Sequence, residues 1–154
     1  VVEMKDHIDN QSDRQNWMSL LAKAPEGAAT ALFDAALARP DFTWLRQPEV
    51  SSVMVQGRAG GTGAPFNLGE MTVTRAALQL PCGTVGHAYL QGRRKPDAQI
   101  AALIDALMQT DQATGIRAAV LTPLSEARTA KRATRAAKAA ATKVDFFTMV
   151  RGDD

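Results

Sequence analysis

A glycine-rich stretch is the segment of this sequence whose composition most suggests chemistry. Four of the seven residues from Gly57 to Gly63 are glycine, and Arg58 and Thr62 lie among them. Glycines allow a loop to turn its backbone N–H groups toward a phosphate. The phosphate-binding loop of ATPases also needs a Lys followed by Ser or Thr after its last glycine, where this chain has Ala64 and Pro65. A nucleotide cradle is therefore one hypothesis, beside a flexible strand connection and a loop that becomes ordered against another protein.

The side chains that could perform acid–base, nucleophilic or metal chemistry are scattered along the chain. No Ser, Cys or Asp is spaced to form a triad with His87, so we expect a histidine whose bonds are satisfied within a sheet. Asp97 and Asp105 show no carboxylate partner, and two His with one Cys form no metal motif. Arg75, on a strand candidate, could bind a phosphate or a carboxylate. We therefore expect no catalytic residue and no metal site.

Basic side chains are concentrated near the C-terminal end. Residues 122–154 carry seven Lys or Arg, and six of these lie between Arg128 and Lys143 in an Ala-rich stretch. At about 100° per residue of a helix, these six fall within an arc of roughly 140°, with alanines on the opposite side. Such a face can be merely solvated, or it can bind nucleic acid, an acidic protein or a phosphorylated ligand. RNA binding usually also needs stacking aromatic rings, which this helix lacks.

The elements that must position these residues indicate one α+β domain at residues 12–154, after a flexible lead-in at residues 1–11. Helical spacing begins after Ser12, which with Gln15 has the spacing of a capping box. A second helix stops before Pro40, which completes a helical hairpin. Alternating patterns then predict an antiparallel meander of about four strands, near 42–46, 52–55, 71–80 and 84–90. Two further helices begin at Pro96 and Pro123, the last being basic and Ala-rich, before an extended segment at 144–150.

Large apolar side chains occur unusually close to the C-terminus. Phe146, Phe147 and Met149 follow a helix whose apolar side chains are small. In a strand, Phe146 and Phe147 would face opposite ways, so we expect one to pack in the core and the other to anchor a partner. The core itself is thin, since 28 residues are Ala and only eight are Phe, Trp or Tyr. We expect part of the stability to come from a partner.

Composition narrows the cellular setting. The chain has 154 residues and a formal net charge of +2, which names no partner by itself. It contains no apolar run of about 18 residues, so we expect no membrane-spanning helix. The first ten residues are polar and acidic, unlike a signal peptide, and the single Cys82 excludes an intramolecular disulfide. These features fit a cytoplasmic protein.

Several of these stretches together resemble one family. They are Arg58–Gly63 with Phe66 and Gly69-Glu70, Val73–Ala76, Gly83–Gly86, Gly92-Arg93, Ala102–Met108 and Val144–Gly152. In this order they resemble the PhnG family, the G subunit of the bacterial carbon–phosphorus lyase core complex, over about Arg14 to Gly152. The chain departs from the pattern near Arg94–Gln99, so no role is carried over to those side chains.

The resemblance implies a function that composition alone does not. Family members are cytoplasmic and assemble with subunits H, I and J, to which an ABC-type protein binds. With partner subunits they support attack of a phosphonate on the ribose of ATP, so that adenine leaves and a ribose 1-phosphonate 5-triphosphate forms. ATP is then a substrate of the complex, while the iron–sulfur cluster and S-adenosylmethionine belong to a partner subunit. The resemblance implies an accessory subunit, with Arg58, Gly60–Gly63, Arg75 and the C-terminal Phe146, Phe147 and Met149 as partner-binding or substrate-proximal candidates.

Overall fold

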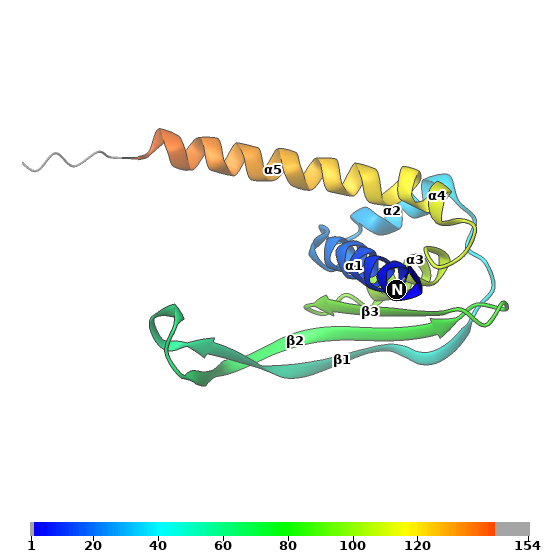
Figure 1. Ribbon diagram of the computed structural model, residues 1–154, viewed down its shortest axis with the longest axis horizontal. Coiled ribbons are helices and arrows are strands. Elements are labelled where there is room, and N and C mark those ends of the chain that lie inside the picture. Colours follow the sequence, from blue (N-terminus) through cyan, green and yellow to red (C-terminus); the bar gives the residue numbers. More distant parts are fainter. Residues whose placement is uncertain (1, 144–154) are drawn as a thin grey trace, which may run out of the picture.

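Helices stack on one face of an antiparallel sheet, which confirms the α+β class. The computed structural model describes residues 2–143, with side chains from residue 11 onward. In chain order the elements are α1 (Val2–Lys23), α2 (Ala28–Ala36), β1 (Thr43–Arg58), η1 (Ala59–Gly61), β2 (Pro65–Gln79), β3 (Val85–Gln91), α3 (Lys95–Leu107), α4 (Ala113–Ile116), η2 (Arg117–Leu121) and α5 (Thr122–Ala141). Figure 1 shows α1 and α3 on the sheet, with α2 and α5 beyond them.

The sheet that the structure describes has three strands in the order β1-β2-β3, and not about four. The segments at 42–46 and 52–55 belong to one strand, β1, whose pairing with β2 shifts register between Arg46 and Glu49. Pro48 lies in that shift. Proline has no N–H to donate but is tolerated in a bulge on an edge strand, and β1 is an edge strand. The strand therefore bends at Pro48 and continues.

The core lies between the sheet and the helices. Phe33, Leu78, Leu90, Leu103 and Ile104 are fully buried there. The apolar stripe predicted for the helix after Pro96 is confirmed, since Ile100, Leu103, Ile104, Leu107 and Met108 are all buried.

Strand β3 runs very close to helix α3 at Gly86. A Cβ at Gly86 would lie 2.0 Å from the Ala102 oxygen and 2.7 Å from the Ala106 nitrogen. Because both are backbone atoms, the strand could not keep this position with any larger residue.

The N-terminal helices differ from the prediction in start and packing. Helix α1 begins at Val2, so Ser12 lies inside it and is not its N-cap. Trp17, Leu21 and Ala24 are buried as the spacing predicts. After the turn at Pro25, helix α2 packs mainly on α3 and η2. The division into a lead-in at 1–11 and a domain at 12–154 remains a prediction.

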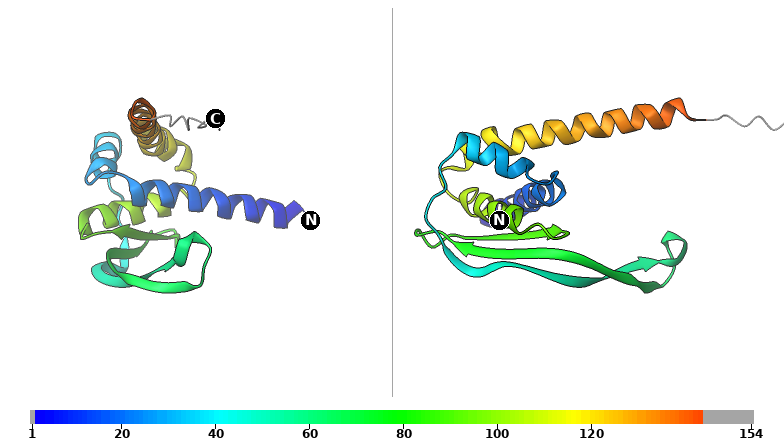
Figure 2. Two further views of the ribbon diagram at one scale, coloured as in Figure 1. Left: turned by 90° about the vertical axis from the view of Figure 1, so that its left-hand side faces the viewer. Right: turned by 180° about the vertical axis from the view of Figure 1, so that it is seen from behind.

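Two elements project beyond this body in the same direction. One is the outer part of the β1–β2 hairpin, here called the hairpin arm and defined as residues 52–70. The other is α5, which runs from Thr122 to Ala141 close to the predicted bounds. Figures 1 and 2 show both reaching past α1, α3 and β3. No helix of the described part is long and apolar enough to cross a membrane.

Candidate functional site

One fully buried polar side chain is the carboxylate of Asp105, on α3. It forms a two-bond ion pair with Arg14, whose Nε and Nη2 lie 3.1 and 2.7 Å from its oxygens. The Trp17 indole N–H and the His87 backbone N–H also donate to it, both at 2.9 Å. One carboxylate thus joins α1, β3 and α3. The sequence prediction found no partner for Asp105, because its partners are not carboxylates and two of them lie 88 and 91 residues away.

A second buried carboxylate, Asp97, joins the α1–α2 turn to the start of α3. It accepts from the Gly27 N–H at 3.1 Å, from the Thr30 hydroxyl at 3.1 Å, and from Arg94 at 2.8 and 2.6 Å. The fully buried Thr74 donates to the Gly92 oxygen at 2.6 Å and accepts from the Arg94 N–H at 2.9 Å. Every one of these bonds stays within the chain, so both carboxylates support the fold. No group of three or more His, Cys, Asp or Glu in the described part could hold a metal ion.

The glycine-rich loop forms the tip of the hairpin arm and closes on itself. The N–H groups of Thr62 and Gly63 both donate to the Ala59 oxygen, the second at 2.8 Å. Arg58 adds a bond from Nη1 to the Gly63 oxygen at 3.1 Å. Gly60 and Gly61 have φ angles of 59° and 82°, which residues with a side chain rarely adopt. Two amides that a phosphate cradle would use are therefore already bonded inside the loop.

Arg75 lies away from this tip, in the part of β2 that pairs with both neighbouring strands. Its Nη2 donates to Glu49 at 2.8 Å, and Arg46 donates to the same carboxylate oxygen. The hydrogen bond from Arg46, reinforced by that from Arg75, lowers the pKa of Glu49 below its usual value. The structure therefore separates Arg75 from Arg58 and Gly60–Gly63, and pairs it with a carboxylate.

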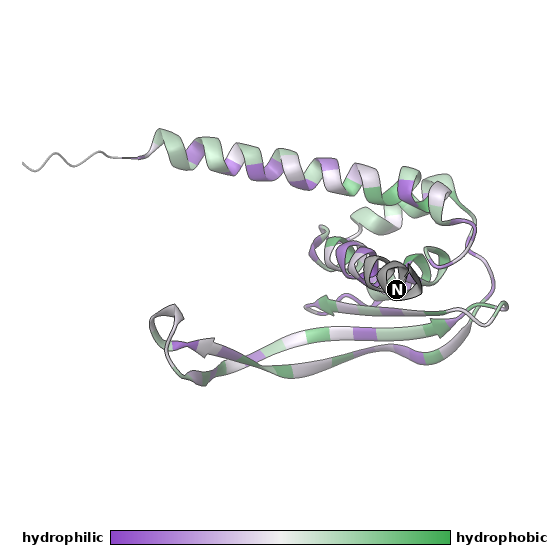
Figure 3. Cartoon of the chain, in the orientation of Figure 1, coloured by the Kyte–Doolittle hydropathy of each residue, from purple (hydrophilic) through white to green (hydrophobic). Residues whose placement is uncertain are grey.

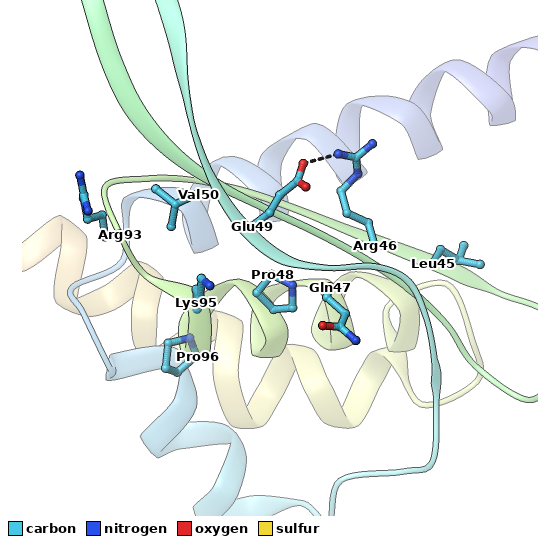
Figure 4. Close-up of a pocket in the computed structure, with 9 residues that line it drawn as sticks. All are labelled: Leu45, Arg46, Gln47, Pro48, Glu49, Val50, Arg93, Lys95 and Pro96. Carbon is cyan, nitrogen blue, oxygen red and sulfur yellow. Dashed lines mark hydrogen bonds and ion pairs between the residues drawn. The ribbon is translucent and has the colours of Figure 1, made fainter.

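The Glu49 cluster borders an open surface pocket of about 930 Å³. Figure 4 shows the lining side chains, in which Arg46 and Glu49 point toward each other and the cations Arg93 and Lys95 lie near the start of α3. The pocket holds three cations and one carboxylate, and its walls are solvent-accessible.

Exposed apolar side chains occur along the hairpin arm. Met54, Phe66 and Leu68 are 53, 49 and 64% exposed. Leu68 and Phe66 lie across Gly57, where an added Cβ would come 2.1 Å from the Leu68 Cδ1 atom. Large apolar groups gathered on a projecting element mark a binding surface more often than single ones do. The sequence prediction placed strand β2 only from Met71 onward, because residues 65–70 are all exposed and show no alternation of buried and exposed positions.

Phe146, Phe147 and Met149 lie outside the described residues, so the proposed core and anchor roles remain predictions. Of the other candidates, Arg58 and Gly60–Gly63 gather at the arm tip.

Comparison with known proteins shows to which family the chain belongs. The family model described as "Phosphonate metabolism protein PhnG" matches residues 12–152. The chain is 43% identical, over 143 residues, to a protein of Rhizobium meliloti (strain 1021) named "Alpha-D-ribose 1-methylphosphonate 5-triphosphate synthase subunit PhnG". That match covers 93% of this chain and 92% of the relative. The chain therefore belongs to the PhnG family.

Proposed function

We propose that the chain is an accessory subunit of a synthase that transfers a phosphonate to the ribose C1′ of ATP and releases adenine. The observation that carries this proposal is the pair of projecting elements, the hairpin arm and α5, whose side chains are mostly exposed, while the buried carboxylates of the body are bonded within the chain. A protein that works alone rarely keeps such long unpartnered elements. The name of the Rhizobium relative, a synthase subunit, supports the same function.

The proposal assigns the chemistry to partners. We expect subunits H, I and J of a carbon–phosphorus lyase complex, and an ABC-type protein, to associate with this chain in the cytoplasm. ATP is bound by the complex, and the iron–sulfur cluster and S-adenosylmethionine by a partner subunit. Within this chain, Arg58, Gly60–Gly63 and the exposed Phe66 and Leu68 are the candidates for partner contact.

The self-closed loop favours a contact with protein over a nucleotide cradle. The Ala59 oxygen already receives the N–H groups of Thr62 and Gly63. A Cβ at Gly63 would lie 2.7 Å from that oxygen, so Gly63→Ala opens the loop. We expect this variant to weaken assembly, and the free chain to bind no ATP in either form. Micromolar ATP binding that Gly63→Ala abolishes would favour the cradle instead.

The test of the function is reconstitution. The neighbouring subunits are co-expressed with and without this chain, and adenine release from ATP and methylphosphonate is followed by chromatography. We expect adenine only when the chain is present with its partners, and none from the chain alone. Adenine release by the purified chain, lost on a point substitution in it, would overturn the accessory role. Full synthase activity without the chain would overturn the proposal entirely.

A further inference from the structure

Helix α5 is anchored to the body only at its beginning. Leu124 is buried and Arg128 is partly buried, whereas every residue from Thr129 to Lys143 is exposed. Figure 1 shows the helix continuing well past the body. Its alanines favour the helical conformation intrinsically. Packing within the described chain does not explain its length, because the residues after Arg128 are exposed.

The cations of this helix form no ion pair within the described chain. Five side chains form what we call the basic stripe: Arg128, Lys131, Arg132, Arg135 and Lys138. None of them makes an ion pair or side-chain hydrogen bond to a described residue, and the sequence has no Asp or Glu from 128 to 143. Several members are three or four residues apart, where like charges repel in a helix. Figure 3 shows hydrophilic segments recurring along α5. An acidic partner would relieve that repulsion.

The direction of the basic stripe follows from the anchor. At about 100° per residue, Leu124 lies roughly 40° from Arg128 and inside the arc of about 140° that the stripe occupies. Because Leu124 points into the body, the stripe faces the same side. Figures 1 and 2 show that the hairpin arm projects on that side. The alanines at 133, 137 and 140 face the other way.

The hairpin arm indicates what kind of molecule would fit opposite the stripe. Val50 pairs with Thr74 on the helix-covered face of the sheet. Met54 lies four residues further along β1 and therefore on the same face, which it continues outward into the arm. It is 53% exposed. Glu70, the cross-strand partner of Met54, lies on the same face. An occupant that reaches both elements would meet cations on α5 and an apolar side chain beside a carboxylate on the arm, which suits the surface of a protein and not the phosphates of a nucleic acid. Residues 122–143 also contain no aromatic ring on which bases could stack.

We infer that the basic stripe of α5 docks an acidic surface of a partner subunit, held on the side of the helix that faces the hairpin arm. This inference rests on the proposed function, since the partner belongs to the same complex. It identifies the binding element, its face and the charge of its partner.

The chain offers a matched pair of variants for the test. Lys131→Gln with Arg135→Gln and Lys138→Gln removes three positive charges from the stripe. Ala133→Glu with Ala137→Glu and Ala140→Glu lowers the charge by the same amount, at the same spacing, on the opposite face. All six positions are exposed, so both variants should keep the melting temperature of the full chain. Affinity for the co-purified partner subunits is measured by biolayer interferometry at low and high salt.

We expect the stripe variant to bind the partners about tenfold or more weakly at low salt and to lose most of the salt dependence. The alanine-face variant should stay within about threefold of the wild type. A carbodiimide should link Lys131 or Lys138 to an Asp or Glu of a partner subunit. Equal losses in both variants, or wild-type affinity in the stripe variant, would overturn the inference.

Two other outcomes distinguish a failure of this inference from a failure of the proposed function. If the wild-type chain fails to join the subunits, the proposed function and the inference both fall. If the chain joins them and the stripe variant joins equally well, only the inference falls. Tighter binding of the wild type to a single-stranded oligonucleotide than to the subunits, lost in the stripe variant, would make α5 a nucleic-acid element and overturn the inference.

Discussion

Strand β2 runs through two regions whose side chains differ in burial. Residues 73–78 lie in the body, where Val73, Thr74 and Leu78 are fully buried and the Thr74 hydroxyl is bonded twice. Residues 65–70 of the same strand lie in the hairpin arm, where every residue is exposed. The backbone is a paired strand throughout. Strand pairing therefore builds the arm, but side-chain burial within the chain does not.

The comparison extends to charge. In the body, Asp105 and Asp97 collect cations and N–H groups from distant segments, so that each charge is compensated internally. On α5, five cations stand together without a described anion. The buried carboxylates of the body find their partners within the chain, whereas the two projecting elements leave apolar and basic side chains exposed. Substitutions in the body should lower stability, and those in the projecting elements should lower assembly.

The largest loss of stability is expected at Asp105. Asp105→Ala leaves the Trp17 and His87 N–H groups and the partly buried Arg14 without their acceptor. Breaking a buried pair in this way costs about 3–5 kcal/mol. The exposed ion pair of Asp34 with Arg39 provides the control, since Asp34→Ala should cost much less than Asp105→Ala. Urea unfolding of the full chain measures both, and equal losses would show that burial does not set the difference.

A matched leucine pair on β2 tests the two regions directly. Leu78 is 0% exposed and Leu68 is 64% exposed, so the same truncation meets a packed core in one case and solvent in the other. Leu78→Ala should cost about 2–5 kcal/mol. Leu68→Ala should leave the melting temperature of the full chain nearly unchanged and instead reduce affinity for the partner subunits. The comparison breaks if Leu68→Ala melts early, or if it assembles with wild-type affinity.

Two glycines in the body differ in how closely other backbone atoms approach them. At Gly86 an added Cβ meets α3 backbone at 2.0 Å, whereas at Gly115, in α4, it meets nothing within 4 Å. Gly86→Ala should therefore destabilise the chain by roughly 1–3 kcal/mol, as overpacking does. Gly115→Ala should stabilise it by about 0.5–1 kcal/mol, because alanine suits a helix better than glycine. Thermal unfolding monitored by circular dichroism measures the stability of both variants. A Gly86→Ala chain as stable as the wild type would contradict the close approach of β3 to α3.

The sequence predicted an element well where the spacing and composition of its own residues determine its secondary structure. Periodicity located α3 and its buried stripe, and Pro123 with the alanines located α5. The strand count failed at Pro48, where a bulge on an edge strand carried β1 past a residue that usually ends a strand. The predicted start of β2 was wrong for a related reason. Pro65 and the exposed arm residues lack the alternation that a half-buried strand shows.

The site was less predictable because its contacts are distant in sequence. No spacing relates Asp105 to Arg14 or Asp97 to Gly27, which only the packing of α1 and α2 brings together. The sequence did reveal the arc of basic residues on α5. It could not show which way that arc faces, because this depends on the burial of Leu124.

The smallest expected effect lies at Glu49, on the border between the body and the hairpin arm. Hydrogen bonds from Arg46 and then Arg75 lower its pKa below the usual 4.5. A carboxylate with a lowered pKa stabilises the fold above its unfolded pKa, and this contribution is lost as pH falls through the folded pKa. Glu49→Gln should therefore be slightly less stable than the wild type at pH 7.

Below pH 4.5 the difference between the Glu49→Gln chain and the wild type should shrink, and it should vanish once Glu49 is protonated. Since the cluster is solvent-exposed, high salt should also reduce the difference at pH 7. Urea unfolding at a series of pH values, with and without added salt, measures both effects. A difference that stays constant from pH 7 to pH 3 would show that the two arginines do not stabilise the body through the charge of Glu49. The border would then behave like the basic stripe of α5, whose cations form no ion pair within the described chain.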